Sequence, residues 1–103
     1  MLLTVDKEGF LRQLSDWNED LAYELALQDD IVLSAEHWEI IKIARAYYLQ
    51  YQISPVNRVL VNLIKQALGS EKGKSIYLMS LFSGKPAKSV SKIAGLPKPN
   101  NCD

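Results

Sequence analysis

The most regular apolar pattern of the chain lies in residues 35–52, which read AEHWEIIKIARAYYLQYQ. Apolar and aromatic residues recur there at intervals of three and four, as they do on one face of an α-helix. The stripe and its flanks comprise Trp38, Ile40, Ile41, Ile43, Ala44, Tyr47, Tyr48 and Tyr51. Ser34 precedes this stretch and Glu36 lies in its first turn, and both residue types favour a helix start. We therefore predict a long helix with Ser34 as its N-cap.

Three shorter helices are predicted after this one. Ser54 and Pro55 are typical of an N-cap followed by the first helical position, and helical apolar spacing then continues to Gly69, whose residue type suits a helix end. The stretch EKGKSIYLMSLF, residues 71–82, predicts the next helix. The stretch PAKSVSKIAG, residues 86–95, predicts a short last helix, because it begins with proline and ends before glycine.

Patterns in the N-terminal third predict a helix and a small β element. Asp16 is the expected N-cap of a helix over residues 17–28, whose apolar positions recur at helical spacing. Upstream, the run LLTV is followed by DKEG and FLRQL, which favours a small β-hairpin. The chain is therefore predicted to be mainly α-helical, with about five helices packed orthogonally in one domain over residues 1–94. Two neighbouring helices are expected to form a helix-turn-helix-like pair.

Composition limits the class of protein and the kinds of site. With 103 residues, of which 48% are hydrophobic and 23% charged, one globular domain is expected. No apolar run approaches the 18 or so residues of a membrane helix, and the start does not resemble a signal peptide, so we expect a soluble cytoplasmic protein. One cysteine and one histidine exclude an internal disulfide and a thiolate zinc site, and no cofactor is expected. The histidine, His37, is expected to be partly exposed.

Charge is distributed unevenly, although 12 acids and 12 bases give a net charge of zero. Residues 1–53 hold ten of the acids and only four bases, whereas residues 54–103 hold two acids and eight bases. We favour attraction between the two halves within the fold as the explanation. The alternative is a basic surface near the C-terminus that meets an acidic protein or RNA.

Nucleic-acid binding is a second class of function that the pattern allows. The helices predicted on either side of the QIS break, residues 52–54, resemble a helix-turn-helix pair. The second helix of such a pair presents several polar side chains to base edges, and here only Asn57, Arg58 and Asn62 could do so. Aromatic residues at helical spacing are more often core than a platform for bases. We therefore favour an ordinary packed pair, with a nucleic-acid-binding module carrying a redox-sensing cysteine as the alternative.

The single cysteine, Cys102, is the residue that most strongly indicates chemistry. Free cysteine is usually buried, but this one follows GLPKPNN, whose prolines prevent a helix and favour an extended chain. We expect residues 95–103 to form a mobile arm that projects from the body and presents the thiol to another protein's active site. Lys98 favours the reactive thiolate and Asp103 opposes it, so activation is expected to come from the partner.

The C-terminal sequence resembles the TusE/DsrC family in EKGKSIYLMSLF, in GKPAKSVSKIAGLPKP and in the penultimate cysteine. The resemblance continues upstream through LSAEHWEIIKIARAYYLQYQISPVNRVLV to DKEGFL, and so covers nearly the whole chain. It implies a small helical domain with an N-terminal hairpin and a mobile arm whose penultimate cysteine carries sulfur as a persulfide. In the TusE branch it implies that a TusBCD-type relay complex supplies the sulfur. The thiouridylase MnmA then receives it for the 2-thio group of wobble uridine in tRNA.

The resemblance also separates two branches of the family. In the DsrC branch a second arm cysteine allows an internal disulfide, and the partner is dissimilatory sulfite reductase. That cysteine aligns with Ser91, which cannot form a disulfide, so a TusE-like sulfurtransferase is favoured and a DsrC-like partner of sulfite reductase is the alternative. Cys102 is the expected persulfide carrier. Further candidates, for docking a partner or holding the arm, are Arg58, Lys74, Lys92 and Lys98.

Overall fold

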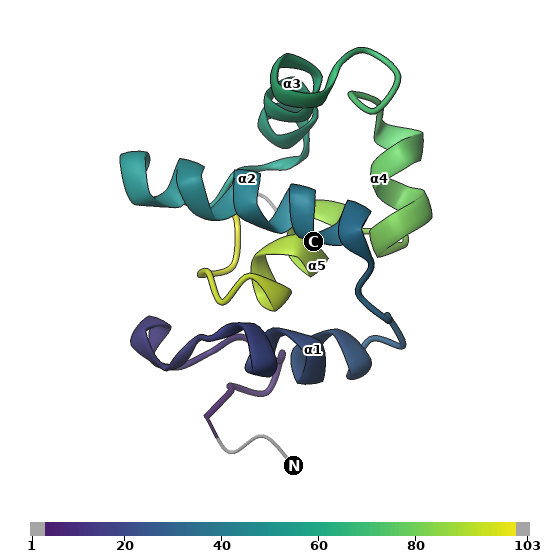
Figure 1. Cartoon of the computed structure of the whole chain (residues 1–103). Coiled ribbons are helices and arrows are strands. Elements are labelled where there is room, and N and C mark those ends of the chain that lie inside the picture. Colours follow the sequence, from purple (N-terminus) through teal and green to yellow (C-terminus); the bar gives the residue numbers. More distant parts are fainter. Residues whose placement is uncertain (1–3, 101–103) are drawn as a thin grey trace.

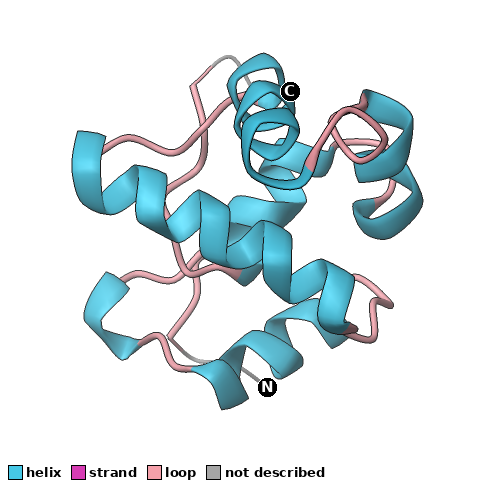
Figure 2. Ribbon diagram, turned by 45° about the horizontal axis from the view of Figure 1, so that its top comes forward, coloured by secondary structure: helices cyan, strands magenta, loops and turns pink. Residues whose placement is uncertain are grey.

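The fold, as described by a computed structural model over residues 4–100, is built from five α-helices (Figures 1 and 2). They are α1 (Glu19–Leu27), α2 (Ala35–Tyr51), α3 (Asn57–Leu68), α4 (Ser75–Phe82) and α5 (Pro86–Ile93), preceded by one turn of 3-10 helix at Leu14–Asp16. The prediction of a mainly α-helical protein with about five helices is confirmed. Within residues 4–100, none of these helices combines the length and apolar character needed to cross a membrane.

The short helix α5 lies at the centre of the molecule. It contacts each of the other four helices, and in Figure 1 it runs between α1 and α2, with α4 beside it. Because neighbours surround it, Val90, Ser91 and Ile93 are fully buried. The chain that leads to Cys102 therefore leaves from the most enclosed helix of the fold.

Helix α2 begins as predicted, with Ser34 as its N-cap. The exposure of its third residue, His37, differs from the expectation. The backbone N–H of Ser34 donates to Nδ1 of His37 at 3.0 Å, which places the ring proton on Nε2, and Nε2 donates to the carbonyl of Leu81 at 2.9 Å. His37 is 8% exposed, so the expectation of a partly exposed histidine was wrong. The imidazole is buried because it satisfies two backbone groups and joins the start of α2 to the end of α4.

Two other helix starts differ from the sequence-based prediction. The N-cap of α1 is Asn18, whose side chain accepts from the backbone N–H of Leu21 at 2.8 Å, and not Asp16. Helix α3 begins at Asn57, two residues later than predicted, and the hydroxyl of Ser54 caps no helix. In both cases a residue with a suitable carboxylate or hydroxyl lies two residues before the observed N-cap.

The N-terminal segment is reduced to a turn with one β-bridge. Val5 and Leu11 form an isolated antiparallel bridge, and the carboxylate of Asp6 accepts from the backbone N–H groups of Glu8 and Phe10 at 2.9 and 3.0 Å. The expected hairpin is thus present only as this bridge within the described residues. Its turn holds Glu8 at a fixed place near the C-terminal segment, which matters for the site.

Candidate functional site

Cys102 lies outside the described residues, so the site is defined by the segment that leads to it. Residues 95–100, here called the anchored segment, follow α5 and run as a loop along the helical body (Figure 2). Asn100, the last of them, is two residues before the thiol. The contacts of this segment show where the chain that leads to the thiol is attached to the helical body.

Two side chains from distant parts of the sequence hold the end of α5. The indole N–H of Trp17 donates to the carbonyl of Ile93 at 2.9 Å, and the guanidinium of Arg45 donates to the carbonyl of Ala94 at 2.6 Å. Carbonyls at a helix end have no partner within the helix, so these bonds satisfy groups that would otherwise be buried unpaired. The guanidinium carbon of Arg45 also lies 3.7 Å from the centre of the Trp17 ring, a cation–π contact. Burial lowers the pKa of Arg45, which stays charged at neutral pH.

Gly95 allows the chain to turn directly beside Trp17. Its φ of +73° lies in the left-handed region, and a Cβ atom here would lie only 2.3 Å from Cδ1 of Trp17. Both the backbone conformation and the lack of space therefore require glycine. The turn sends Leu96 back toward the core, where its N–H donates to the carbonyl of Ser91 at 2.8 Å.

The segment does not leave the body at Gly95, which differs from the expectation of an arm that projects from that residue. Leu96 is 3% exposed and belongs to the hydrophobic core, and Pro99 is buried as well. The hydroxyl of Ser54 donates to the carbonyl of Pro97 at 2.6 Å. This bond accounts for the serine that caps no helix. The mobile arm over residues 95–103 stays a prediction, and its described part is packed against the body.

Lys98 is held by the turn at the other end of the chain. Its ammonium lies 3.1 Å from a carboxylate oxygen of Glu8, and the ammonium of Lys88 lies 3.5 Å from the same oxygen. The hydrogen bond from Lys98 is the main cause that lowers the pKa of Glu8 below its ordinary value of 4.5, with the charges of both lysines adding to it. Glu8 and Lys98 are exposed, so the contact between them is screened by solvent and readily broken.

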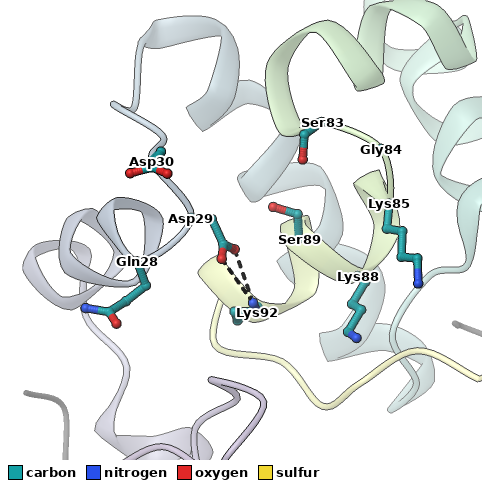
Figure 3. Close-up of a pocket in the computed structure, with 9 residues that line it drawn as sticks. All are labelled: Gln28, Asp29, Asp30, Ser83, Gly84, Lys85, Lys88, Ser89 and Lys92. Atoms are coloured by element: carbon teal, nitrogen blue, oxygen red, sulfur yellow. Dashed lines mark hydrogen bonds and ion pairs between the residues drawn. The ribbon is translucent and has the colours of Figure 1, made fainter.

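Lys92 joins α5 to the end of α1. Its ammonium contacts both carboxylate oxygens of Asp29 at 3.2 and 3.3 Å, and its side chain is only 15% exposed. Figure 3 shows this pair on one wall of an open groove of about 510 Å³, with Lys88 and Ser89 nearby. The pairing and burial give Lys92 a structural role in holding α1 to α5.

Arg58 and Lys74 lie elsewhere. Arg58 is in the first turn of α3 and Lys74 precedes α4, both are exposed, and neither forms an ion pair with a described acid. Helices α3 and α4 stand on the side of the molecule opposite α1 (Figure 1). The structure therefore separates the four candidate bases into Lys92 and Lys98, which are paired, and Arg58 and Lys74, which are not.

Sequence reasoning missed the side chains that hold the end of α5 (Trp17 and Arg45) and the anchored segment (Glu8 and Ser54). None has a local signal for this role, because each contact joins residues more than 40 positions apart. Ser91, where the resemblance implies a cysteine in the DsrC branch, is fully buried beneath the turn at Gly95. Its hydroxyl has no hydrogen-bond partner among residues 4–100. No cluster of metal-ligating side chains is found over that range either.

Comparison with known proteins extends over nearly the full length of the chain. A family model described as "DsrC like protein" matches residues 2–102, a range that includes Cys102. Sulfurtransferase TusE of Sodalis glossinidius is 51% identical over 100 residues, which are 97% of this chain and 93% of that protein.

Solved structures agree with this match. The NMR structure of Allochromatium vinosum DsrC has a TM-score of 0.86 at 49% identity, covering 96% of this chain and 88% of that one. The crystal structure of the oxidized gamma-subunit of dissimilatory sulfite reductase (DsrC) from Archaeoglobus fulgidus has a TM-score of 0.82 at 36% identity. It covers 96% of this chain and 90% of that one. The helical body and the sequence that follows it are therefore shared features.

Proposed function

This chain belongs to the DsrC-like protein family and is a sulfurtransferase, and we propose that it carries sulfur as a persulfide on Cys102 for the 2-thiolation of wobble uridine in tRNA. The observation that carries the proposal is the family match through residue 102, in a chain whose only thiol is that residue. TusE proteins at 46–51% identity support a carrier over a catalyst that acts alone.

The proposed reaction is an exchange between sulfur atoms. The thiolate of Cys102 attacks the terminal sulfur of a donor persulfide, so that a new S–S bond forms at Sγ while the donor's S–S bond breaks. The donor leaves as a thiolate, and the terminal sulfur keeps its proton, which gives Cys102–S–SH. In the second step a thiolate of the acceptor attacks that terminal sulfur, and the Cys102 thiolate is the leaving group. No external oxidant or reductant is needed in either step.

Ser91 supports a one-thiol carrier. A protein with cysteine at both positions could close a disulfide, but a serine hydroxyl cannot take part in thiol–disulfide exchange. Ser91 is also fully buried, below the turn that Gly95 makes. A single sulfur carrier of this kind suits a relay between two proteins, and we propose a TusBCD-type complex as donor and an MnmA-type tRNA thiouridylase as acceptor. The reducing cytoplasm is the compartment in which such a thiol stays free.

The contacts of the anchored segment indicate where the proposed arm would bend. Leu96 is part of the core. Beyond it, Pro97 and Lys98 are held by one hydrogen bond and one exposed ion pair, and the buried Pro99 becomes uncovered when the segment is released. We therefore place the hinge after Leu96 and not at Gly95. Six extended residues from Leu96 to Cys102 span roughly 20 Å, but only about 7 Å separates Cys102 from Asn100 at full extension. Release of Pro97 and Lys98 thus sets how deeply the thiol can enter a partner.

The proposal is tested by sulfur loading of the purified protein. We expect intact-mass analysis after incubation with a small-molecule persulfide to show one added sulfur atom on wild type and none on Cys102→Ser. Circular dichroism should show the same helical content for both proteins, because the substituted residue follows the last helix in the sequence. If wild type takes up no sulfur, or if Cys102→Ser takes up as much as wild type, the carrier function is wrong.

A further inference from the structure

Half of the bases in the C-terminal half have no acidic partner in the structure. Lys72, Lys88, Lys92 and Lys98 pair with Glu39, Glu8, Asp29 and Glu8 respectively. No described acid lies within 4.0 Å of the other four, which are Arg58, Lys65, Lys74 and Lys85. Attraction between the two halves of the chain therefore accounts for only part of its uneven charge.

Helix α4, which follows Lys74 and precedes Lys85 in the sequence, exposes apolar side chains. Its sequence SIYLMSLF is apolar at six of eight positions, a composition typical of a helix that is covered on all sides. Only Leu78 and Phe82 are fully buried, whereas Ile76 is 76% exposed and Met79 is 48% exposed. These two residues are three positions apart and share one face of the helix. That face has no cover within the described chain.

A small apolar notch lies beside this face. It has a volume of about 150 Å³ and is formed by α3, α4 and the loop before α5. Its lining consists of Asn57, Val61, Ser75, Leu78, Met79, Gly84 and Pro86. We call this cavity the α4 notch. No acid is among its lining residues, and within residues 54–100 Glu71 is the single acid of the sequence.

Three of the unpaired bases flank the α4 notch along the chain. Arg58 follows Asn57, Lys74 precedes Ser75, and Lys85 lies between Gly84 and Pro86, so each is bonded to a residue that lines the cavity. An apolar cavity with three bases next to its lining residues in the sequence is complementary to a protein segment that presents an apolar side chain together with carboxylates. Nucleic acid would use the cations but would leave the exposed Ile76 and Met79 without a role.

We propose that the α4 notch is a docking site for a partner protein that inserts an apolar side chain flanked by acidic residues. This inference deepens the proposed function, because the partner is taken to be one of the two proteins between which sulfur moves. The notch is built by α3, α4, the loop before α5 and the first residue of α5, and its lining includes no residue of the anchored segment. Binding of the partner at the notch and binding of the arm in the partner's active site strengthen each other. Docking at the notch raises the local concentration of the thiol at the partner's site.

The docking site is tested by binding, without sulfur chemistry. We would titrate the purified TusBCD-type complex, and separately the MnmA-type enzyme, into full-length Cys102→Ser protein by calorimetry. Adding Ile76→Ser with Met79→Ser, or Arg58→Glu with Lys74→Glu, should weaken binding to at least one of them by roughly tenfold or more. Matched controls are Val32→Ser, at a residue 77% exposed, and Lys42→Glu, at an exposed base without a described partner. Both should bind like the parent protein.

Three results would overturn the docking site. The first is a set of notch variants that bind both proteins as tightly as the parent protein, or control variants whose affinity falls as much as that of the notch variants. The second is loss of tRNA binding alone, which would assign the face to nucleic acid. The third is a parent protein that sediments as a dimer, with notch variants that sediment as monomers and bind both proteins normally. Sulfur loading by a small persulfide is independent of all three, so failure of the docking site and failure of the carrier function are distinguishable.

Discussion

Trp17 and Gly95 show how individual residues determine where the chain leaves α5. The indole donates to the carbonyl of Ile93 and at the same time fills the space in which any side chain at position 95 would lie. Arg45 covers the ring and bonds the next carbonyl. A change at one of these three residues should therefore alter the direction of the C-terminal segment as well as the stability of the fold.

Gly95→Ala should destabilise the protein. The left-handed backbone at residue 95 costs alanine about 1–2 kcal/mol, and overlap with Trp17 adds to that cost. Urea denaturation should show this loss in the free energy of unfolding. Gly84→Ala is the matched control, because a Cβ there meets nothing within 4 Å, and it should be neutral or slightly stabilising. Equal effects of the two substitutions would contradict the packing described at Gly95.

The contact between Glu8 and Lys98 should depend on pH in acid only. The pKa of Glu8 is lowered in the folded protein, mainly by its hydrogen bond from Lys98, so its contribution is present above its ordinary pKa of 4.5. The contribution is lost as the pH falls through the lowered pKa, where the carboxylate takes up a proton.

NMR relaxation of the Lys98 amide measures this loss. Mobility should rise when the pH is taken well below 4.5 and should stay constant between 4.5 and neutral pH. Glu8→Gln should show the higher mobility throughout, with no further change in acid. A transition near neutral pH would mean that another group holds Lys98.

Among the elements, α5 and the anchored segment form one unit whose later part is lightly held. Ser54→Ala removes the hydrogen bond to the Pro97 carbonyl, and so should lower the free energy of unfolding by only about 1 kcal/mol. The order parameter of the Lys98 amide should fall from about 0.85 toward 0.6, while amides of α5 are unchanged.

Ser89→Ala is the control for this substitution. Ser89 is buried to nearly the same extent as Ser54, but its hydroxyl has no partner in the described part of the chain. The control should leave Lys98 as ordered as in wild type. If Ser54→Ala also leaves it unchanged, the hinge does not lie after Leu96.

The helices themselves could be predicted from the sequence, because apolar spacing reports a buried face. Their starts were less predictable. Ser54 and Asp16 are good capping residues by type, yet Ser54 bonds Pro97, 43 positions away, and Asn18 caps α1 in place of Asp16. His37 could not be predicted as buried, since its partner Leu81 belongs to another helix. At Ser54 and His37, a tertiary partner took the polar group that local preference would have assigned otherwise.

For the site, the sequence identified the thiol but not the side chains that contact the segment leading to it. A single cysteine after two prolines, within a recognisable family ending, is visible without a structure. The residues that hold the end of α5 and the anchored segment come from the N-terminal turn, from α2 and from the two loops that precede α1 and α3, and only the fold brings them together. The structure was likewise needed to show that Lys92 and Lys98 form ion pairs and that Arg58 and Lys74 form none with a described acid.

For the whole molecule, we propose different tasks for two surfaces. The C-terminal segment is held by contacts that can be broken beyond Leu96, and the α4 notch is an apolar cavity flanked along the chain by unpaired bases. A sulfur carrier needs both release and recognition, because it must leave one partner and find the next. The body around α5 keeps Leu96, where the segment begins to be releasable, and the α4 notch in a fixed relation.

Transfer of labelled sulfur from the isolated carrier is the decisive measurement. Wild-type protein is loaded with radioactive sulfur, freed of donor, and mixed with the MnmA-type enzyme, ATP and unmodified tRNA. We predict that the label leaves Cys102 and appears as 2-thiouridine in tRNA, in a yield that follows the amount of persulfide loaded. Label that remains on the carrier, or that reaches tRNA equally from Cys102→Ser protein treated in the same way, would contradict the function proposed for this chain.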